Sequence, residues 1–481
     1  SYSVTGVQTC ALPILNKYNL KHKPFNIYRN SRIRGSVAIS NNQIASIYAD
    51  EKFIWVGTFG YGLNKIDRVS KKVDIFSTRS EDTKKLVNNW VHVIYKDIKG
   101  LIWIGTRNGI HIYNPQTEKL KQLADLYPFA SGLNLSNNRV YTLMEDLYNN
   151  MWIGTENGIY YISFTEKNTR TFSFDQGTSI GLLSNRIFSL KQQPDGTVWI
   201  GTSRGLVKYD PETHKYTQYT SKTNTTNSIT HNHVYCTHVD SDGNLWIGTL
   251  SGLNRMNLKT GHILQLTTKN GLPHDLIYAV LEDQKGDIWV STDHGLARID
   301  KRSLKIRSYD DDDGLQGLEF NFGSHFKAAD GQLFFGGQNG FNAFYPDSII
   351  DNTMFAPVVF TWLEKISKNG SEKISIEFVD KIDLYPGDLI FTIEFSALDF
   401  TQPSKNQYQY RLEGVENEWI KIGTRKFATF SNLQPGTYRL EVKGSNSDGK
   451  WNPDSKILQI VIHPPFWQTN LAYFKIGRAH V

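Results

Sequence analysis

Four short segments of this chain combine residue types that carry out chemistry in other proteins. Gly201-Thr-Ser-Arg-Gly205 has the spacing with which serine hydrolases expose a nucleophile. Asp240-Ser-Asp-Gly-Asn244 has the oxygen ligands that open a calcium loop, and residues 310–313 are four consecutive aspartates. His231 and His233 would share one face of a strand, where two imidazoles can begin a zinc site.

Each segment also has a simpler interpretation. The serine pattern requires a strand-to-helix turn, whereas here it occupies a turn that recurs along the chain with other residues. The calcium-like loop lacks its closing glutamate, and the acidic run is typical of a solvated turn. His238 would face away from His233, no cysteine or carboxylate completes a tetrahedral set, and Cys236 is expected to be a small buried residue. We therefore predict no catalytic residue, no metal ligand and no cofactor.

The elements that must position these residues are copies of one repeated sequence motif. Each copy has a tryptophan, a branched aliphatic residue, Gly-Thr and a turn that ends in Gly-Leu or its equivalent. Repeats 43 to 49 residues apart that contain only short strands indicate a propeller or an array. The copies begin at Trp55, Trp103, Trp152, Trp199, Trp246, Trp289 and, in altered form, Phe334.

The second copy illustrates how one repeat folds. Residues 90–95, 101–105, 110–113 and 120–123 read as strands, and turns such as Asp97-Ile-Lys-Gly100 separate them. Four antiparallel strands make one propeller blade. We expect the tryptophan to pack between neighbouring blades and the glycine of Gly-Thr to permit close approach.

Counting strands predicts how the ring closes. Six copies have a fourth strand, but the seventh stops at Tyr345-Pro346, while a spare strand, Phe25-Asn-Ile-Tyr28, precedes the first copy. We expect this strand to complete the seventh blade, because closure protects sheet edges. The predicted fold class is all-β: a seven-bladed β-propeller over residues 23–350, then an immunoglobulin- or fibronectin-like β-sandwich over residues 356–463.

Composition excludes several classes of protein. The net charge of +6 is mild for 481 residues, and the basic residues are interspersed with acidic ones, so nucleic-acid binding is not expected. No run of 18 apolar residues could span a membrane. Two cysteines are too few for a disulfide framework.

The two ends of the chain differ from the rest. Back-translation allows Ile476-Gly-Arg-Ala-His-Val481 and Thr9-Cys-Ala-Leu-Pro-Ile14 to be reverse complements, as sequencing-adaptor read-through would produce. We therefore expect residues 1–22 to be a non-native or disordered segment. We expect residues 464–481 to be a truncated juxtamembrane segment with a non-native tail.

A ligand is expected where the repeat varies. The start of a blade's first strand and the end of its second lie on one face, and the residues there differ between copies. Aromatic rings stack on sugars, and the guanidinium group of arginine forms paired hydrogen bonds with carboxylate or sulfate. We therefore predict an oligosaccharide ligand, with an acidic one as a candidate. Glu156, Asp275 and Asp293 would moderate the positive charge. Unconstrained loop residues are the simpler interpretation. The predicted ligand-binding residues are Trp90, Arg107, Arg139, Arg186, Arg204, His233 and His294.

Two motifs resemble known families. The repeated sequence motif resembles the two-component regulator propeller. The pattern Tyr408-x-Tyr410-x-Leu-Glu-Gly414, together with Tyr438, resembles the triple-tyrosine domain that follows such propellers. The resemblance implies the periplasmic sensor region of a bacterial hybrid two-component histidine kinase. It also implies a membrane-anchored homodimer that detects an oligosaccharide and controls polysaccharide-utilisation genes, in which this fragment is not itself an enzyme. Tyr408 and Tyr410 would share one face of a strand, so we expect core or interface roles for them.

Two other functions stay open at this point. A propeller hydrolase or lyase would show a convergent acid–base cluster with perturbed pKa values in the channel. A protein-interaction scaffold would show a broad apolar face and no glycan binding.

Overall fold

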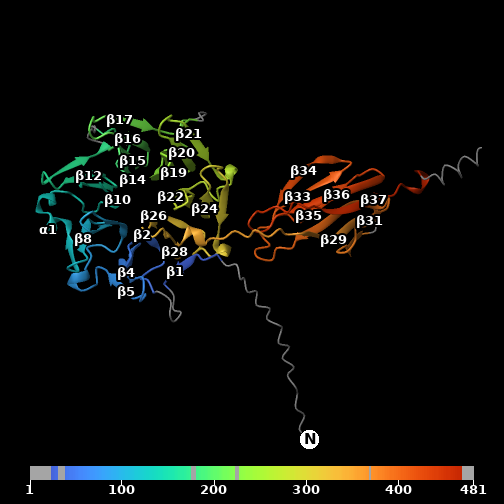
Figure 1. Cartoon of the computed structure of the whole chain (residues 1–481), viewed down its shortest axis with the longest axis horizontal. Coiled ribbons are helices and arrows are strands. Elements are labelled where there is room, and N and C mark those ends of the chain that lie inside the picture. The colour runs from blue at the N-terminus through green and yellow to red at the C-terminus, as the bar shows by residue number, and fades with distance from the viewer. Residues whose placement is uncertain (1–22, 31–37, 175–179, 223–226, 368–369, 469–481) are drawn as a thin grey trace, which may run out of the picture. The chain divides into compact units, whose positions relative to one another are not determined.

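The computed structural model divides the chain into two compact units, Lys23–Ile349 and the part that follows Ile349 (Figure 1). The structure describes residues 23–30, 38–174, 180–222, 227–367 and 370–468. Each unit is built almost entirely from strands. Helical structure in the described residues is limited to α1 (Leu123–Leu126) and 3₁₀ turns at Asp82–Lys84, Pro128–Ala130, Thr268–Asn270, Asp311–Asp313, Pro346–Ser348 and Phe466–Gln468.

The first unit contains seven four-stranded antiparallel sheets, one for each copy of the repeat. The innermost strands are β2 (Ile44–Ala49), β6 (Val91–Lys96), β10 (Val140–Glu145), β14 (Ile187–Gln192), β18 (Val234–Val239), β22 (Ile277–Glu282) and β26 (Phe320–Lys327). The second strands, which carry the tryptophans or Phe334, are β3 (Phe53–Thr58), β7 (Ile102–Thr106), β11 (Met151–Thr155), β15 (Val198–Thr202), β19 (Asn244–Thr249), β23 (Ile288–Thr292) and β27 (Leu333–Gly337).

The outer half of each sheet follows the same order. The third strands are β4 (Leu63–Asp67), β8 (Ile110–Asn114), β12 (Gly158–Ser163), β16 (Gly205–Tyr209), β20 (Gly252–Asn257), β24 (Gly295–Ile299) and β28 (Gly340–Phe344). The outermost strands are β5 (Val73–Phe76), β9 (Lys119–Gln122), β13 (Asn168–Phe172), β17 (Tyr216–Tyr219), β21 (Ile263–Leu266), β25 (Ile306–Tyr309) and β1 (Asn26–Tyr28).

The ring is closed by the first strand of the chain. β1 pairs antiparallel with β28, which confirms that the spare strand completes the seventh blade. The innermost strands lie against one another in sequence order, and β26 of the last blade lies against β2 of the first. A 2.9 Å ion pair from Arg68 to Asp330 also joins the first and seventh blades. The prediction of a closed seven-bladed ring is confirmed.

The repeated residues form the contacts between blades. Trp103 of the second blade is fully buried against Val140, Leu143 and Ile153 of the third, as predicted. The glycine of Gly-Thr allows this approach, because a Cβ on Gly57 would lie 2.5 Å from the carbonyl oxygen of the next blade's first strand. The scaffold therefore depends on residues that recur in most copies.

The second unit is a two-sheet β-sandwich. One sheet has the order β30-β29-β32-β35 and the other β31-β37-β36-β33-β34. The core between them contains fully buried side chains such as Phe360, Ile393 and Leu440. The strands are β29 (Val358–Ser367), β30 (Gly370–Ser375), β31 (Lys381–Leu384), β32 (Asp388–Ala397), β33 (Tyr408–Glu413), β34 (Glu416–Gly423), β35 (Phe427–Ser431), β36 (Gly436–Gly444) and β37 (Lys456–Ile462).

The sandwich has more strands than the sequence indicated. About seven short strands were expected and six of them could be located in the sequence, whereas the structure has nine, and β30, β31 and β34 had not been located. β30 has no buried side chain, so it lacks the alternation of apolar and polar residues that marks a half-buried strand. The short β31 pairs parallel with β37, a pairing that local turn signals do not reveal. Within the part of the chain that the structure describes, no helix is both long and apolar enough to cross a bilayer.

Candidate functional site: the aromatic mouth of the propeller channel

Every innermost strand has an irregularity next to its first residue. In the third blade, pairing with the second strand skips from Val140 to Thr142, which leaves Tyr141 without a partner. The same one-residue skip occurs in five other blades. A β-bulge redirects the side chain of its extra residue. The residues at these positions are Ala45, His92, Tyr141, Phe188, Tyr235 and Tyr278.

The seventh blade departs further from a regular strand. Its irregular stretch runs from Phe320 to His325 and contains Phe322. Gly323 has a φ of 77° and lies so close to the first blade that an added Cβ would be 3.2 Å from the carbonyl oxygen of Ala45. The seventh blade thus approaches the first at the one bulge position that carries a small residue.

The bulged rings meet across the channel. Phe322 of the seventh blade contacts Tyr141, Phe188 and Tyr235, with ring centroids 6.1, 5.4 and 5.5 Å apart. These partners belong to the third, fourth and fifth blades, so the contacts can form only across the central axis of the ring. We call these six rings the aromatic floor: His92, Tyr141, Phe188, Tyr235, Tyr278 and Phe322.

The aromatic floor was not predicted from the sequence, although a signal was present. The predicted residues lie just before each innermost strand, as Trp90 and Arg139 do. Two positions later five of the seven copies have an aromatic residue or histidine, as His92 and Tyr141 do, and in the seventh copy Phe322 follows one position further on. The bulge that turns these side chains toward the axis has no signature in the alternation of apolar and polar residues.

The rim above this floor forms as predicted. The backbone N–H of Arg107 donates to the carbonyl of Trp90 at 3.1 Å, and Glu156 donates to Arg139 at the same distance. Leu250 donates to His233 at 3.2 Å. The start of each blade's first strand and the end of its second are therefore on the same face, next to the aromatic floor.

Trp90 is an exposed aromatic platform on this rim. Its side chain is held edge-to-face by Phe59 at 5.7 Å, and the guanidinium carbon of Arg107 lies 5.6 Å from its ring centroid. A Cβ on Gly60 would lie 3.3 Å from the indole nitrogen, so the glycine allows the ring to lie close to the turn. Trp90 keeps 37% of its surface exposed, enough for a flat ligand to stack on it.

Two predicted arginines converge on one carboxylate. Arg186 lies 3.2 Å from Glu156, and Nε of Arg139 lies 3.8 Å from the other oxygen of the same carboxylate. All three side chains are partly exposed to solvent. The structure therefore brings Arg139 and Arg186 together, with Glu156 between them.

The two histidines near the floor are held in the neutral form. Burial lowers the pKa of His92 to about 4, and the positive charges of Arg139 and Arg107 act in the same direction. His233 stacks on Phe188 at 4.7 Å, and burial, followed by nearby His231 and Arg186, lowers its pKa. These rings therefore add to the stacking surface and do not carry a charge near neutral pH.

One rim position, Asp275, differs from the prediction, while the predicted binding roles of Arg204 and His294 stay predictions. Arg204 and His294 are exposed on the turns and make no side-chain hydrogen bond, ion pair or ring contact with the rest of the site in the described residues. Asp275 is not on the rim, because its carboxylate accepts the backbone N–H of Thr268 at 2.7 Å and so fixes the connection between blades. The residue before β22 is Leu276.

The other end of the channel holds an ionic cluster beside a cavity of about 550 Å³. Lys301 donates to Glu282 at 2.8 Å and to Ser241 at 2.7 Å. Burial opposes ionisation of Glu282, but nearby His238, whose Nε2 lies 3.8 Å away, and hydrogen bonds from Lys301 and Ser241 outweigh it and lower the pKa of this carboxyl. The pKa of Lys301 is raised by Glu282 and Asp242 against the effect of burial. Both partners are thus charged, which is typical of a structural ion pair.

The remaining motifs have structural roles. Ser203 lies in the hairpin between β15 and β16 and shares a 2.7 Å hydrogen bond with Ser184, so no nucleophile elbow forms. Asp240 caps its own turn and accepts the indole N–H of Trp246 at 2.8 Å. Asp313 is buried and pairs with Lys23, which corrects the expectation of a solvated turn throughout this run. The described residues contain no cluster of metal-ligating side chains.

Cysteine and tyrosine residues also follow the sequence analysis. Cys236 is buried, as expected, whereas Cys10 lies outside the described residues. Tyr408 is fully buried in the core of the sandwich, and its hydroxyl oxygen accepts the backbone N–H of Ala397 at 3.0 Å. Tyr410 packs against the same core. The expected core role of both tyrosines is confirmed.

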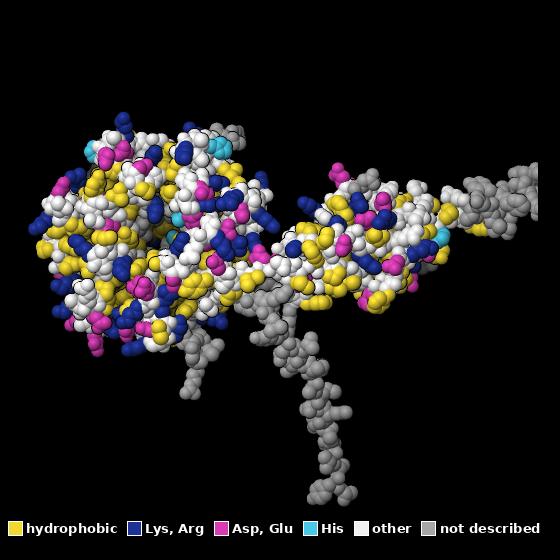
Figure 2. Space-filling model, in the orientation of Figure 1, with side chains coloured by type: hydrophobic (Ala, Val, Ile, Leu, Met, Phe, Trp, Pro, Cys, Tyr) yellow, Lys and Arg dark blue, Asp and Glu magenta, His cyan; other side chains and the backbone are white. Residues whose placement is uncertain are grey.

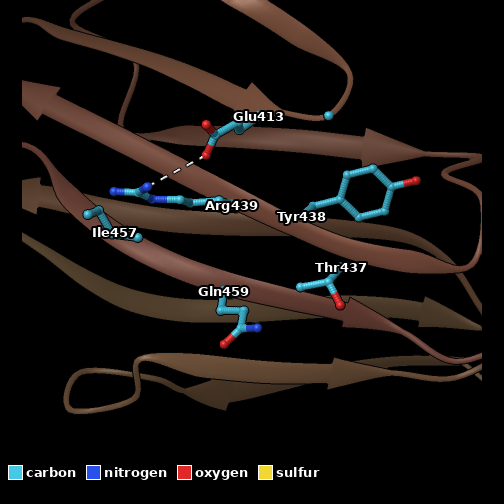
Figure 3. A pocket seen from close by; sticks show the side chains of 7 residues that line it. Glu413, Thr437, Tyr438, Arg439, Ile457 and Gln459 are labelled. Atoms are coloured by element: carbon cyan, nitrogen blue, oxygen red, sulfur yellow. Dashed lines mark ion pairs between the residues drawn. The ribbon is translucent and has the colours of Figure 1, made fainter.

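A second hollow lies on the sandwich, beside β33, β36 and β37. It has a volume of about 490 Å³. Figure 3 shows Arg439 turned toward Glu413, with which it forms a 3.7 Å ion pair, and Tyr438 farther along the same strand. The hydroxyl of Tyr438 donates to the carbonyl of Gln434 at 2.9 Å, which fixes the ring at the start of β36.

The chain thus folds as a closed seven-bladed propeller with an aromatic channel mouth, followed by a β-sandwich. Residues 399–463 match the model of the Y_Y_Y domain. Five segments match the two component regulator propeller, and each includes the start of an innermost strand and the end of the second strand: residues 85–108, 134–157, 181–204, 228–251 and 271–294. The chain therefore carries two-component regulator propeller repeats followed by a Y_Y_Y domain.

One sequence relative and one solved structure are similar to this chain. The chain is 34% identical over 175 residues to Histidine kinase P4 of Formosa agariphila, which is 35% of this chain and 13% of that protein. Its fold matches the extracellular domain of the hybrid two component system BT3049 from B. thetaiotaomicron with a TM-score of 0.77 and 27% identity. That match covers 92% of this chain and 57% of the solved one. The chain thus spans only part of the length of each protein it resembles.

Proposed function

We propose that this chain is the extracytoplasmic ligand-sensing region of a hybrid two-component histidine kinase, and that it binds an oligosaccharide at the channel mouth. The observation that carries the proposal is the aromatic floor beneath an exposed Trp90 and a rim of arginines. Sugars are recognised by stacking on aromatic rings combined with hydrogen bonds from polar side chains. The similarity to the extracellular domain of BT3049 supports the sensor role and a location outside the cytoplasm, with the periplasm as the proposed compartment.

Signalling requires that the ligand favour one arrangement of the sensor over another. We place this change in the relation between propeller and sandwich, across a homodimer of the membrane-anchored parent protein. The Pro464-Pro465 segment at the end of the sandwich would pass the change on. Control of polysaccharide-utilisation genes is part of the same proposal.

An enzymatic function is the second candidate, and the charged groups of the mouth favour binding instead. Glu156 is engaged by Arg139 and Arg186, and Asp293 accepts the hydroxyl of Tyr278 at 3.1 Å. A glycosidase needs two carboxyl groups that flank one bond, one of them protonated near neutral pH. Both carboxylates of the mouth are instead engaged by neighbouring side chains of the protein.

A thermal-shift and calorimetric screen of neutral and acidic oligosaccharides tests the proposal. A ligand raises the melting temperature by mass action, and replacing both Arg139 and Arg186 by alanine should weaken binding at least tenfold. Analysis of the recovered sugar separates a sensor, which returns it intact, from a hydrolase or lyase. Binding that survives the double substitution would remove the mouth from consideration, and the absence of any saccharide ligand would favour an interaction scaffold.

A further inference from the structure

The two sides of the propeller mouth carry opposite charge. Arg107, Arg139 and Arg186 belong to the second, third and fourth blades. Arg139 and Arg107 are close enough to His92 to lower its pKa in addition to the effect of burial. Arg186 acts in the same way on His233. A positive arc therefore borders one side of the aromatic floor.

The opposite side of the floor faces carboxylates. Tyr278 of the sixth blade donates its hydroxyl to Asp293 at 3.1 Å. Burial raises the pKa of this tyrosine, and the charges of Asp293 and Glu319 raise it further. Burial, followed by Asp293, also raises the pKa of Tyr235. The sixth and seventh blades thus offer hydrogen-bond acceptors to a ligand on the floor.

Within the positive arc one anionic position is already defined by the protein itself. The carboxylate of Glu156 bridges Arg139 and Arg186 at 3.8 and 3.2 Å. The side chains remain 34%, 57% and 28% exposed for Arg139, Arg186 and Glu156, and exposed ion pairs of this kind are weak. An incoming carboxylate or sulfate could therefore take the place of Glu156 at little cost.

Arg107 is a further cation of the positive arc. Arg107 forms no ion pair with a carboxylate in the described residues, and its guanidinium lies over the ring of Trp90. A sugar ring stacked on Trp90 would lie next to Arg107, whose donors could reach substituents of that sugar. The arc therefore combines a stacking surface, an unpaired arginine and a bridged arginine pair.

We propose that the mouth selects an anionic saccharide, whose acid group replaces Glu156 between Arg139 and Arg186 and whose hydroxyl-bearing end lies toward Asp293. This inference rests on the proposed function and adds the charge and the direction of the ligand. Glu156 is a specificity residue in this scheme, because it repels any anion that does not displace it. Asp293 and Glu319 disfavour a second acid group at the far end.

The test uses an array on which each uronic-acid or sulfated oligosaccharide is printed beside its carboxyl-reduced or desulfated counterpart. The chain should bind acidic members and lose at least tenfold in affinity for their neutral counterparts. For the acidic ligand with the highest affinity, Glu156→Gln should tighten binding by about threefold to tenfold, because a competing charge is removed. Arg186→Gln should weaken it at least tenfold and flatten its dependence on salt.

Two further variants serve as controls for the binding test. Glu118→Gln removes an exposed carboxylate from the turn between β8 and β9 and should leave affinity unchanged. Asp293→Asn should weaken binding of the hydroxyl-bearing end without abolishing discrimination between acidic and neutral members. Melting temperatures of all variants report on folding, and the partly exposed positions should change them little.

The failures of the two proposals are distinguishable. Equal binding of acidic and neutral counterparts, or an affinity that Glu156→Gln leaves unchanged, overturns this inference while a saccharide sensor stands. Binding to no member of the array overturns the proposed function and the inference with it.

Discussion

The indole N–H of Trp103 donates a 2.8 Å hydrogen bond to the carboxylate of Asp97, six residues earlier in the chain. The same bond recurs from Trp152 to Asp146, from Trp246 to Asp240 and from Trp289 to Asp283. In the seventh blade the equivalent residues are Phe334 and Ala328, so neither donor nor acceptor is present. The first blade breaks the pattern, because the residue six positions before Trp55 is Ala49, which has no acceptor, and the buried indole N–H of Trp55 has no partner.

This exception gives a prediction about stability. Trp55→Phe removes an unsatisfied donor together with part of the ring, whereas Trp103→Phe removes a satisfied donor and leaves Oδ2 of Asp97 without its hydrogen-bond partner. An unpaired buried polar group costs about 1–3 kcal/mol, so Trp103→Phe should be more destabilising than Trp55→Phe by about that amount. Urea unfolding of the two variants measures the difference. Equal losses would show that the indole hydrogen bond contributes nothing to the scaffold.

Close approach of the blades gives a second prediction. A Cβ on Gly57 would lie 2.2 Å from Oγ of Ser46 and 2.5 Å from the carbonyl oxygen of Val91. Gly57→Ala should therefore force the first and second blades apart and cost about 1–3 kcal/mol. Gly132→Ala is the control, because an added Cβ there meets nothing within 4 Å. Chemical denaturation compares them, and a neutral Gly57→Ala variant would contradict the packing described here.

Buried histidines predict a loss of stability in acid. Burial lowers the pKa of both His92 and His111 to about 4, below the ordinary value of about 6.5. The unfolded chain therefore binds more protons between these values, so the stabilising contribution is complete above about pH 6.5 and is lost as the pH falls toward 4. Each histidine should cost about 2 kcal/mol between pH 6.5 and 5.

The measurement compares the melting temperature at pH 7.5 and pH 5 for the parent chain and His111→Gln. The variant should lose less stability on acidification than the parent, since one buried group no longer resists protonation. His262→Gln, at an exposed position, serves as the control and should follow the parent. A variant as acid-sensitive as the parent would exclude His111 as a source of the effect.

Trp90 gives a prediction about ligand binding. If a sugar stacks on this ring, Trp90→Ala should weaken binding of the ligand found in the glycan screen at least tenfold, which is about 1.4 kcal/mol. The effect on stability should be small because the ring is partly exposed. Trp362→Ala is the matched control, since this tryptophan is similarly exposed on the sandwich. Calorimetric titration measures the affinity of each variant for this ligand. Equal affinities of the Trp90→Ala and Trp362→Ala variants would show that the ligand binds elsewhere.

On the face shown in Figure 2, basic and acidic side chains are interspersed and the propeller is hollowed near its middle. The charges that matter for the inference are few and local, such as Arg186 and Glu156. Local charge pairs of this kind confer specificity more than affinity.

Most of the scaffold could be predicted from the sequence because its signals are local. Trp103 and the glycine of Gly-Thr recur at a fixed spacing, and the count of strands was enough to predict that residues 25–28 close the ring. The rim positions followed from the same logic, since Trp90 and Arg107 meet through a hairpin within one blade. Neighbours separated by one turn are determined by the chain that joins them.

The functional arrangement of the mouth was decided only by the tertiary structure. Phe322 and Tyr141 are far apart in sequence and meet because seven twisted sheets close around one axis and a bulge turns each ring inward. Glu156 could have paired with either neighbour, and the curvature of the ring lets it bridge Arg139 and Arg186. Periodicity along the chain specifies which residues repeat, whereas contacts across the axis depend on the radius and twist that the whole ring adopts.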